Sequence, residues 1–308
     1  GGADGAFGAG VLYGWSRSGK RPQFDIVTGV STGALMSVMA FIGPSRDEDL
    51  KRLYTRITNS DIYRDKGFAG MFSASLYDYT PLKRQISQVV DDRLLDEIAA
   101  GHRAGRRLYV ATTNLDAGKL VVWDIGAIAA SNNRYRLRVI QKILRASAAV
   151  PGFFKPVYIQ PLVTSKARQM HVDGSVKAPV LVRSFMFKSA AKARNKTLYI
   201  IVNGHLRLVE ESLPVKPEVM AISRKSITEL LRGLLYKTLY QAYVTTRNAR
   251  GKFRLTAIPA NIPASKDPLI FRTDEMNRLF TAGERIGLAG GNWMREPPRL
   301  QSLQRVGG

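Results

Sequence analysis

The chain has 308 residues, of which 45% are apolar, and it carries a formal net charge of +23 with no cysteine. This length allows one large or two ordinary domains, and the apolar content is enough for a sizeable core. The lack of cysteine excludes disulfides, thiol catalysis and cysteine-based metal sites, and no apolar run approaches the ~18 residues that a membrane-spanning helix needs.

The positive charge is concentrated in the second half of the chain. Residues 1–150 carry a net charge of +7, whereas residues 151–308 carry +16. Such a surface attracts anionic lipid headgroups or nucleic acid, and a general basic bias of the protein is the alternative explanation. Because zinc-finger spacing, RNP-like aromatic motifs and heptad-linked basic regions are all lacking, nucleic acid is the weaker candidate partner.

The first ten residues read GGADGAFGAG and predict a glycine loop followed by a helix from Gly5 to Trp15. The glycines of this helix would let it pack close to a neighbouring element. Because a glycine loop seldom opens a chain, we expect a strand before Gly1, and a targeting segment there would lie outside the sequence. The patterns GxxxxGK[ST] and GxGxxG do not occur in the loop, which disfavours a nucleotide site.

Residues 23–36 predict a buried strand, a very tight turn and a helix, with GVSTG at the turn. A serine on such an elbow has strained backbone geometry, so Gly29 and Gly33 supply neighbours without bulk. The turn places the Ser31 hydroxyl at the N-terminus of a helix that starts at Thr32, where developing negative charge is favoured. The motif indicates a nucleophile, and a glycine-rich turn with a bystander serine is the alternative.

The rest of the chain alternates between strands and helices, which indicates an α/β fold with a mainly parallel sheet. Residues 59–81 read as an aromatic loop that folds onto the core or, alternatively, covers a lipid site. Periodicity predicts helices over 47–58, 82–104, 134–149, 217–248 and 274–288, and strands over 107–113, 119–123, 168–172, 197–202 and 253–258, with the first two strands forming a hairpin.

A nucleophilic serine needs a base, and two candidates are present. Ser31, Asp173 and His205 follow the chain order of an α/β-hydrolase triad, but only 30 residues precede Ser31, too few for the strands of that fold. The second candidate is Asp173 itself, which ends a predicted strand and is followed by Gly174. At such a strand end a partly desolvated carboxylate can take the serine proton directly. The glycine loop at the start of the chain can supply backbone N–H donors for an oxyanion.

Taken together, these residues resemble the patatin-like phospholipases, a family of lipid acyl hydrolases with a Ser–Asp dyad. GGADGAFGAG resembles the family's oxyanion loop, GVSTG its nucleophile elbow, and VDGS its DG[GA] motif, and residues 146–157 resemble the segment before the aspartate. The resemblance covers roughly residues 1–205. It implies a three-layer fold with a mainly parallel central sheet flanked by helices, in one N-terminally truncated domain over 1–308, with residues 206–308 adding C-terminal helices and strands.

The resemblance also implies roles for individual residues. Ser31 would be the nucleophile and Asp173 the base, without a metal or cofactor. The oxyanion hole would be formed by Gly1, Gly2 and Ala3, with Thr32 as a further donor. Three features depart from the family pattern: the leading glycine of the usual triplet is expected before Gly1, Asp4 stands where Arg or Lys is usual, and Ser175 replaces Gly or Ala.

These expectations describe a serine acyl hydrolase that cleaves fatty-acyl esters of lipids at a lipid or membrane surface, where the basic surface favours anionic membranes. Two alternatives stay open. Asp4 and the +16 second half fit a lipid-surface binding protein with a degenerate hydrolase fold. A Ser–Asp–His esterase that uses His205 is the other alternative.

Overall fold

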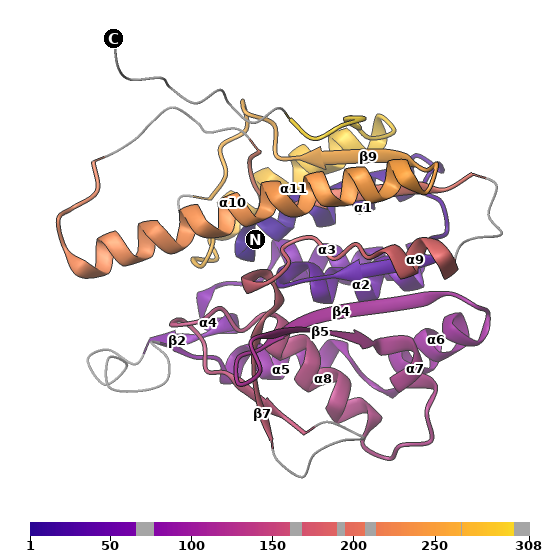
Figure 1. Cartoon of the computed structure of the whole chain (residues 1–308), viewed down its shortest axis with the longest axis horizontal. Coiled ribbons are helices and arrows are strands. Elements are labelled where there is room, and N and C mark those ends of the chain that lie inside the picture. Colours follow the sequence, from indigo (N-terminus) through magenta and orange to yellow (C-terminus); the bar gives the residue numbers. More distant parts are fainter. Residues whose placement is uncertain (66–76, 161–167, 190–194, 207–213, 266, 299–308) are drawn as a thin grey trace.

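The structure, a computed structural model, describes residues 1–65, 77–160, 168–189, 195–206, 214–265 and 267–298. Strands lie between layers of helices (Figure 1). Strand β4 (Arg107–Asn114) shows the two faces of the main sheet. Its Leu108 and Val110 enter the largest apolar core, whereas Ala111 packs with Leu181 and Met186 on the opposite face. This alternation is the period-2 pattern of a strand buried on both sides.

The main sheet is mixed rather than mainly parallel. Strand β1 (Ile26–Gly29) pairs in parallel with β4, but β5 (Lys119–Asp124) and β7 (Gln169–Asp173) pair with β4 in antiparallel fashion, as β6 (Val157–Ile159) does with β7. The expected hairpin of β4 and β5 is confirmed. Because its short turn returns the chain at once, the two strands must run antiparallel. The predicted α/β class is confirmed. In the described part of the main sheet, however, β1 and β4 are the one pair of strands that runs parallel.

The register of β4 determines where the motifs meet. Strand β5 occupies one edge of β4 along residues 109–114, so β1 and β7 must both pair with the other edge. On that edge Gly29 lies opposite Val110, and Asp173 lies opposite Thr112, two residues further along. The ends of β1 and β7 therefore approach each other from opposite directions.

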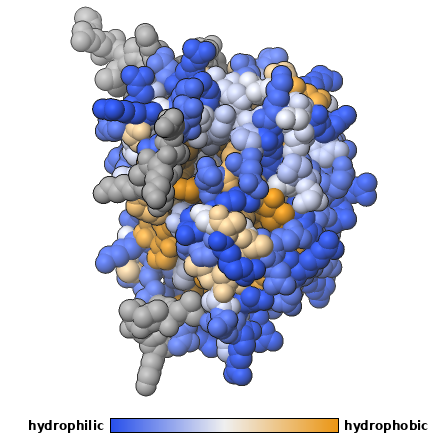
Figure 2. Space-filling view, turned by 90° about the vertical axis from the view of Figure 1, so that its right-hand side faces the viewer, coloured by the Kyte–Doolittle hydropathy of each residue, from blue (hydrophilic) through white to orange (hydrophobic). Residues whose placement is uncertain are grey.

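A second, two-stranded sheet consists of the parallel strands β8 (Thr197–Val202) and β9 (Lys252–Ala257), joined through the long helix α10 (Val219–Asn248). A cavity of about 420 Å³ separates β8 from β1, with Ile26 and Val27 on one side and Leu198 and Tyr199 on the other. Neither Ser31 nor Asp173 lines this cavity. On the side of the molecule shown in Figure 2, hydrophobic residues gather near the middle of a largely hydrophilic face.

The two ends of the described chain share one core, because helix α1 (Gly5–Arg17) packs along α11 (Thr273–Leu288). A Cβ atom on Gly10 would lie 2.1 Å from the Phe280 carbonyl oxygen, and one on Gly283 would lie 2.1 Å from the Phe7 carbonyl oxygen. Such a close approach of two backbones requires glycine. The expected close packing of the first helix is thus confirmed.

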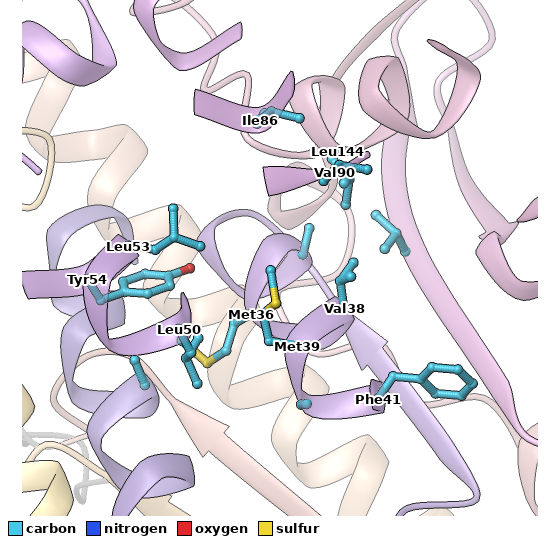
Figure 3. Close-up of a cluster of buried hydrophobic side chains, with 14 of the residues drawn as sticks. Met36, Val38, Met39, Phe41, Leu50, Leu53, Tyr54, Ile86, Val90 and Leu144 are labelled. Atoms are coloured by element: carbon cyan, nitrogen blue, oxygen red, sulfur yellow. The ribbon is translucent and has the colours of Figure 1, made fainter. Parts of the chain in front are cut away.

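Helix α2 (Thr32–Ile42) follows the elbow and lies in the centre of the main core (Figure 3). Its Met36, Val38, Met39 and Phe41 are buried among side chains of the neighbouring helices. These neighbours are α3 (Asp47–Thr55), α5 (Thr80–Val89), α6 (Asp92–Arg103) and α8 (Arg136–Ser147). Burial of α2 along its length fixes the position of its first turn, where Ser31 lies.

The helical periodicity predicted over 82–104 is confirmed, and the segment divides into two helices, α5 and α6. Helix α5 ends at Val89, and Asp91 caps the N-terminus of α6, where its carboxylate accepts the Leu94 N–H at 2.8 Å. Residues 66–76 of the predicted aromatic loop lie outside the described residues, while Tyr63, Tyr77 and Tyr79 beside them pack on the core.

Several short elements went unpredicted: η1 (Gly2–Asp4), η2 (Pro44–Arg46), α4 (Asn59–Ile62), β2 (Arg64–Asp65), β3 (Tyr77–Asp78), α7 (Ile125–Ala130), η4 (Gly174–Val176) and α9 (Ser184–Ser189), as well as β6. Among the described helices, none is both long and apolar enough to cross a bilayer.

Candidate active site

Ser31 adopts the strained backbone conformation that the elbow motif predicts. Its φ is 57° and its ψ is −132°, and among the described non-glycine residues only Arg250 also has a positive φ. Such geometry costs about 1–3 kcal/mol and persists only where the surroundings enforce it. Here β1 leads directly into the turn and α2 starts at the next residue, so the Ser31 side chain stands at the N-terminus of a buried helix.

A second serine, Ser147, is buried behind this turn and holds it in place. The Ser31 N–H donates to Ser147 Oγ at 3.1 Å, and the Ser147 hydroxyl donates to the Ala111 carbonyl at 2.8 Å. Ser147 is fully buried at the end of α8. One hydroxyl therefore satisfies two backbone groups and ties the elbow to β4 and α8. The only feature of the sequence that pointed to Ser147 was its position within residues 146–157, which resemble the family's segment before the aspartate.

The motif glycines differ in how far they are required by packing. A Cβ on Gly29 would lie 2.4 Å from the Gly33 carbonyl oxygen and from Ser37 Oγ, and one on Gly174 would lie 2.5 Å from the Ala111 carbonyl oxygen. Both positions exclude a larger residue. By contrast, a Cβ on Gly33 would meet no heavy atom of the described residues within 4 Å. The expectation that Gly33 is needed for lack of bulk is therefore not supported by its surroundings.

Asp173 ends β7 at the point where β1 also ends. Its side chain is buried, and Oδ1 accepts the Ser175 N–H at 2.8 Å. Oδ2 is buried without a hydrogen-bond partner of ordinary geometry among the described residues. Burial raises the pKa of Asp173, and the Ser31 hydroxyl is the largest influence in the opposite direction. A carboxylate with one free oxygen, made more basic by desolvation and near a serine hydroxyl, can accept that hydroxyl's proton.

The histidines are engaged elsewhere. His205 Nε2 accepts the Ala264 N–H at 3.2 Å, and in the described part of the chain no hydrogen bond joins His205 to Ser31 or Asp173. His171 lies on β7, where its Nδ1 is 2.9 Å from Thr112 Oγ1, and burial lowers its pKa. His102 Nδ1 lies 3.7 Å from a carboxylate oxygen of Asp124.

The four expected oxyanion donors have different surroundings. Gly1 is next to the nucleophile, since a Cβ there would be 3.9 Å from Ser31 Oγ. The Ala3 N–H already donates to the Pro268 carbonyl at 2.8 Å, so it is not available in this arrangement. No acceptor in the described regions binds the N–H of Gly2 or of Thr32.

Thr32 is oriented by a residue that sequence reasoning missed. The Tyr54 hydroxyl donates to the Thr32 carbonyl at 2.6 Å and lies 3.3 Å from Thr32 Oγ1. Burial raises the pKa of Tyr54 to about 12, so the phenol stays protonated and keeps its donor. Tyr54 lies in the helix predicted over 47–58, and its polar contact depends on tertiary packing that no local pattern shows.

Asp4, which stands where the family usually has Arg or Lys, makes a structural contact inside the protein. It is buried, and its Oδ1 accepts the Ser265 N–H at 2.9 Å. The carboxylate therefore fastens the end of η1 to the 259–265 segment. Within the described ranges, no group of three or more histidine, aspartate or glutamate side chains could hold a metal ion.

The fold and the site define an α/β protein in which a strand–turn–helix presents a strained serine beside a buried aspartate. The sequence model of the patatin-like phospholipases matches residues 1–186. The chain belongs to this family of lipid acyl hydrolases.

Two further comparisons add little to this assignment. Among solved structures, the chain is similar to VipD from Legionella pneumophila, with 12% identity over 94% of this chain and a TM-score of 0.41. The match spans 65% of the VipD chain. No curated protein matches the chain.

Proposed function

We propose that the protein is a serine acyl hydrolase that cleaves fatty-acyl esters of lipids through a Ser31–Asp173 dyad. The carrying observation is the meeting of β1 and β7 on one edge of β4, which brings the strained serine to a buried carboxylate with a free oxygen. The conclusion is also supported by membership of a family of lipid acyl hydrolases.

In the first step, Oδ2 of Asp173 accepts the proton of the Ser31 hydroxyl while Oγ attacks the ester carbonyl carbon. The tetrahedral intermediate then collapses, the bond to the leaving alcohol breaks, and Asp173 returns the proton to that alcohol. Water attacks the acyl-serine with the same aspartate as base, which releases the fatty acid and restores the Ser31 hydroxyl. The cycle consumes one water per ester and leaves the enzyme unchanged.

The oxyanion would be stabilised by backbone N–H groups at the start of α2 and in the glycine loop. The N–H of Thr32 and that of Gly2 are the best placed to donate, because neither has an acceptor in the described structure. The helix N-terminus adds a favourable field for negative charge. Each such donor is worth on the order of 10²–10³ in rate.

Hydrolysis of a chromogenic short-chain ester tests the dyad. We expect Ser31→Ala to abolish turnover, and Asp173→Asn to lower it by about 10²–10⁴-fold, the range that a positioned base contributes. His205→Ala serves as the control and should retain activity. Loss of activity in His205→Ala with retention in Asp173→Asn would instead support the triad.

A lipid-surface binding protein without turnover is the second candidate, favoured by the engagement of the Ala3 N–H with Pro268. In that case the wild-type chain would sediment with anionic vesicles, release no fatty acid and leave Ser31 unlabelled by a fluorophosphonate. The basic surface supports association with anionic membranes under either candidate.

A further inference from the structure

Helix α10 has a packed half and an unpacked half. In the C-terminal half, Leu239, Ala242 and Thr246 are buried, and the first two pack with β8 and β9. In the N-terminal half the exposed fraction is 80% for Val219 and 73% for Leu230. Val219, Ile222, Ile227 and Leu230 of this half account for four of the twelve large hydrophobic residues that are exposed among the described residues.

The unpacked half projects on the side of the molecule where Ser31 lies. Thirty residues of helix span about 45 Å, whereas the six residues of β8 span only about 20 Å. Because β8 and β9 are parallel and α10 ends just before β9, the helix must extend past the carboxyl end of β8. Figure 1 shows this end of α10 reaching beyond the body. We call residues 219–234 the α10 overhang.

The carboxyl end of β8 adjoins the candidate active site. The Gly1 nitrogen lies 2.7 Å from the carbonyl oxygen of Asn203, the residue after β8. A Cβ on the same glycine would be 3.9 Å from Ser31 Oγ. The α10 overhang and the nucleophile therefore share one end of the molecule.

The α10 overhang is amphipathic in the sense that suits a membrane surface. Val219, Ile227 and Leu230 fall on one side of the helix. Lys225 and Arg232 lie on the other side, and both reach Glu229, which Lys225 contacts at 2.8 Å and Arg232 at 3.7 Å. Residues 219–234 contain three basic residues and one acidic residue, a net charge of +2. Helices with an apolar stripe and a basic polar face lie in the bilayer interface and favour anionic lipid.

We propose that the α10 overhang is a docking surface for an anionic lipid bilayer, which it holds against the end of the molecule that carries Ser31. The inference rests on the proposed function for the identity of the substrate and names the surface that would bring the enzyme to it. Exposed apolar side chains supply the insertion, and the net positive charge selects the lipid. A second copy of the chain, packed helix to helix, is the competing occupant.

Sedimentation with vesicles tests the proposal. Wild type should bind vesicles of phosphatidylcholine mixed with phosphatidylserine, and it should bind them less at high salt. Leu230→Asp should weaken this binding about tenfold or more, because it replaces an inserting side chain with a charge of the wrong sign. The matched control is Val244→Asp, an exposed valine (52%) in the packed half of the same helix, which should bind like wild type.

A charge reversal gives an independent reading. Lys237 is exposed one turn beyond the overhang and on the side of Leu230, so Lys237→Glu should also weaken vesicle binding about tenfold. Both variants should hydrolyse a soluble short-chain ester at the wild-type rate if the proposed activity holds. Vesicle binding itself does not depend on that activity, and Ser31→Ala should bind as wild type does.

Three results would overturn the proposal. In the first, the wild-type chain does not bind the mixed vesicles. In the second, wild type and Leu230→Asp bind them equally. In the third, light scattering shows a wild-type dimer that Leu230→Asp converts to a monomer, and neither protein binds vesicles. The last result would assign the overhang to contact between copies of the chain.

Discussion

Replacement of Ser147 by alanine probes how the elbow is held. The substitution removes one hydroxyl that accepts the Ser31 N–H at 3.1 Å and donates to the Ala111 carbonyl at 2.8 Å. Both backbone groups would then lack a partner in a region where Ser147 is fully buried. Leaving buried polar groups unsatisfied costs about 1–3 kcal/mol. At roughly 3 °C per kcal/mol for a chain of this size, the midpoint of thermal unfolding should fall by about 3–9 °C.

The same substitution should affect catalysis through geometry. With the Ser31 N–H released, the strained turn has one fewer restraint, and the hydroxyl departs from its place beside Asp173. Misplacement of a reacting group by about 1 Å costs up to about 100-fold in rate, so kcat should fall about 10- to 100-fold while KM stays near the wild-type value.

Calorimetry and ester hydrolysis measure the two effects side by side. Ser87→Ala is the control, because its hydroxyl donates to the Lys83 carbonyl on the exposed surface of a helix. That change should stay within about 0.5 kcal/mol. An unchanged unfolding midpoint in Ser147→Ala would refute the bridging role. A lower midpoint with unchanged kcat would refute the positioning role.

Three further predictions concern stability. Burial raises the pKa of Asp173, so the folded state binds this proton more tightly than the unfolded state does, and wild-type stability is lost as pH rises from about 3.9 through the folded pKa. Asp173→Asn should therefore unfold at a higher temperature than wild type at pH 8, and the difference between their unfolding temperatures should close toward pH 4. A difference that stays constant with pH would contradict this cause. Asp47 forms a buried ion pair with Arg21 at 2.8 Å. Asp47→Ala should therefore lower the free energy of unfolding, measured in urea, by about 3–5 kcal/mol. A decrease of less than about 1 kcal/mol would show that the pair is not isolated from water. Gly10→Ala should prevent the close packing of α1 on α11 and destabilise the fold. Gly233→Ala should instead stabilise it by about 0.5–1 kcal/mol, because the added Cβ meets no described atom within 4 Å. Similar effects of the two substitutions on stability would contradict the close-packing account.

Local patterns predicted those parts of the site that lie within one short segment. The apolar strand, the glycines and the helix around Ser31 are contiguous, so the elbow could be read from the sequence and its strained φ is observed. Asp173 was predicted from the strand before it and from a family resemblance. The break between α5 and α6 was missed although Asp91 offered a helix-capping signal there.

Contacts between distant segments could not be predicted in this way. The sharing of one β4 edge by β1 and β7 depends on which side β5 takes, and no single strand carries that information. Ser147 and Tyr54 read as ordinary helix positions, yet their hydroxyls fix the elbow and the first turn of α2. The engagement of the Ala3 N–H by Pro268 joins residues 265 positions apart and leaves no trace in either segment.

Identification of the nucleophile tests the central proposal most directly. The folded wild-type chain would be treated with a fluorophosphonate and digested, and the modified peptide would be sequenced by mass spectrometry. The dyad predicts one adduct, on Ser31, that Asp173→Asn forms much more slowly and that heat-unfolded protein does not form. An unmodified Ser31 in folded protein that hydrolyses esters, or an adduct on another serine, would contradict the assignment.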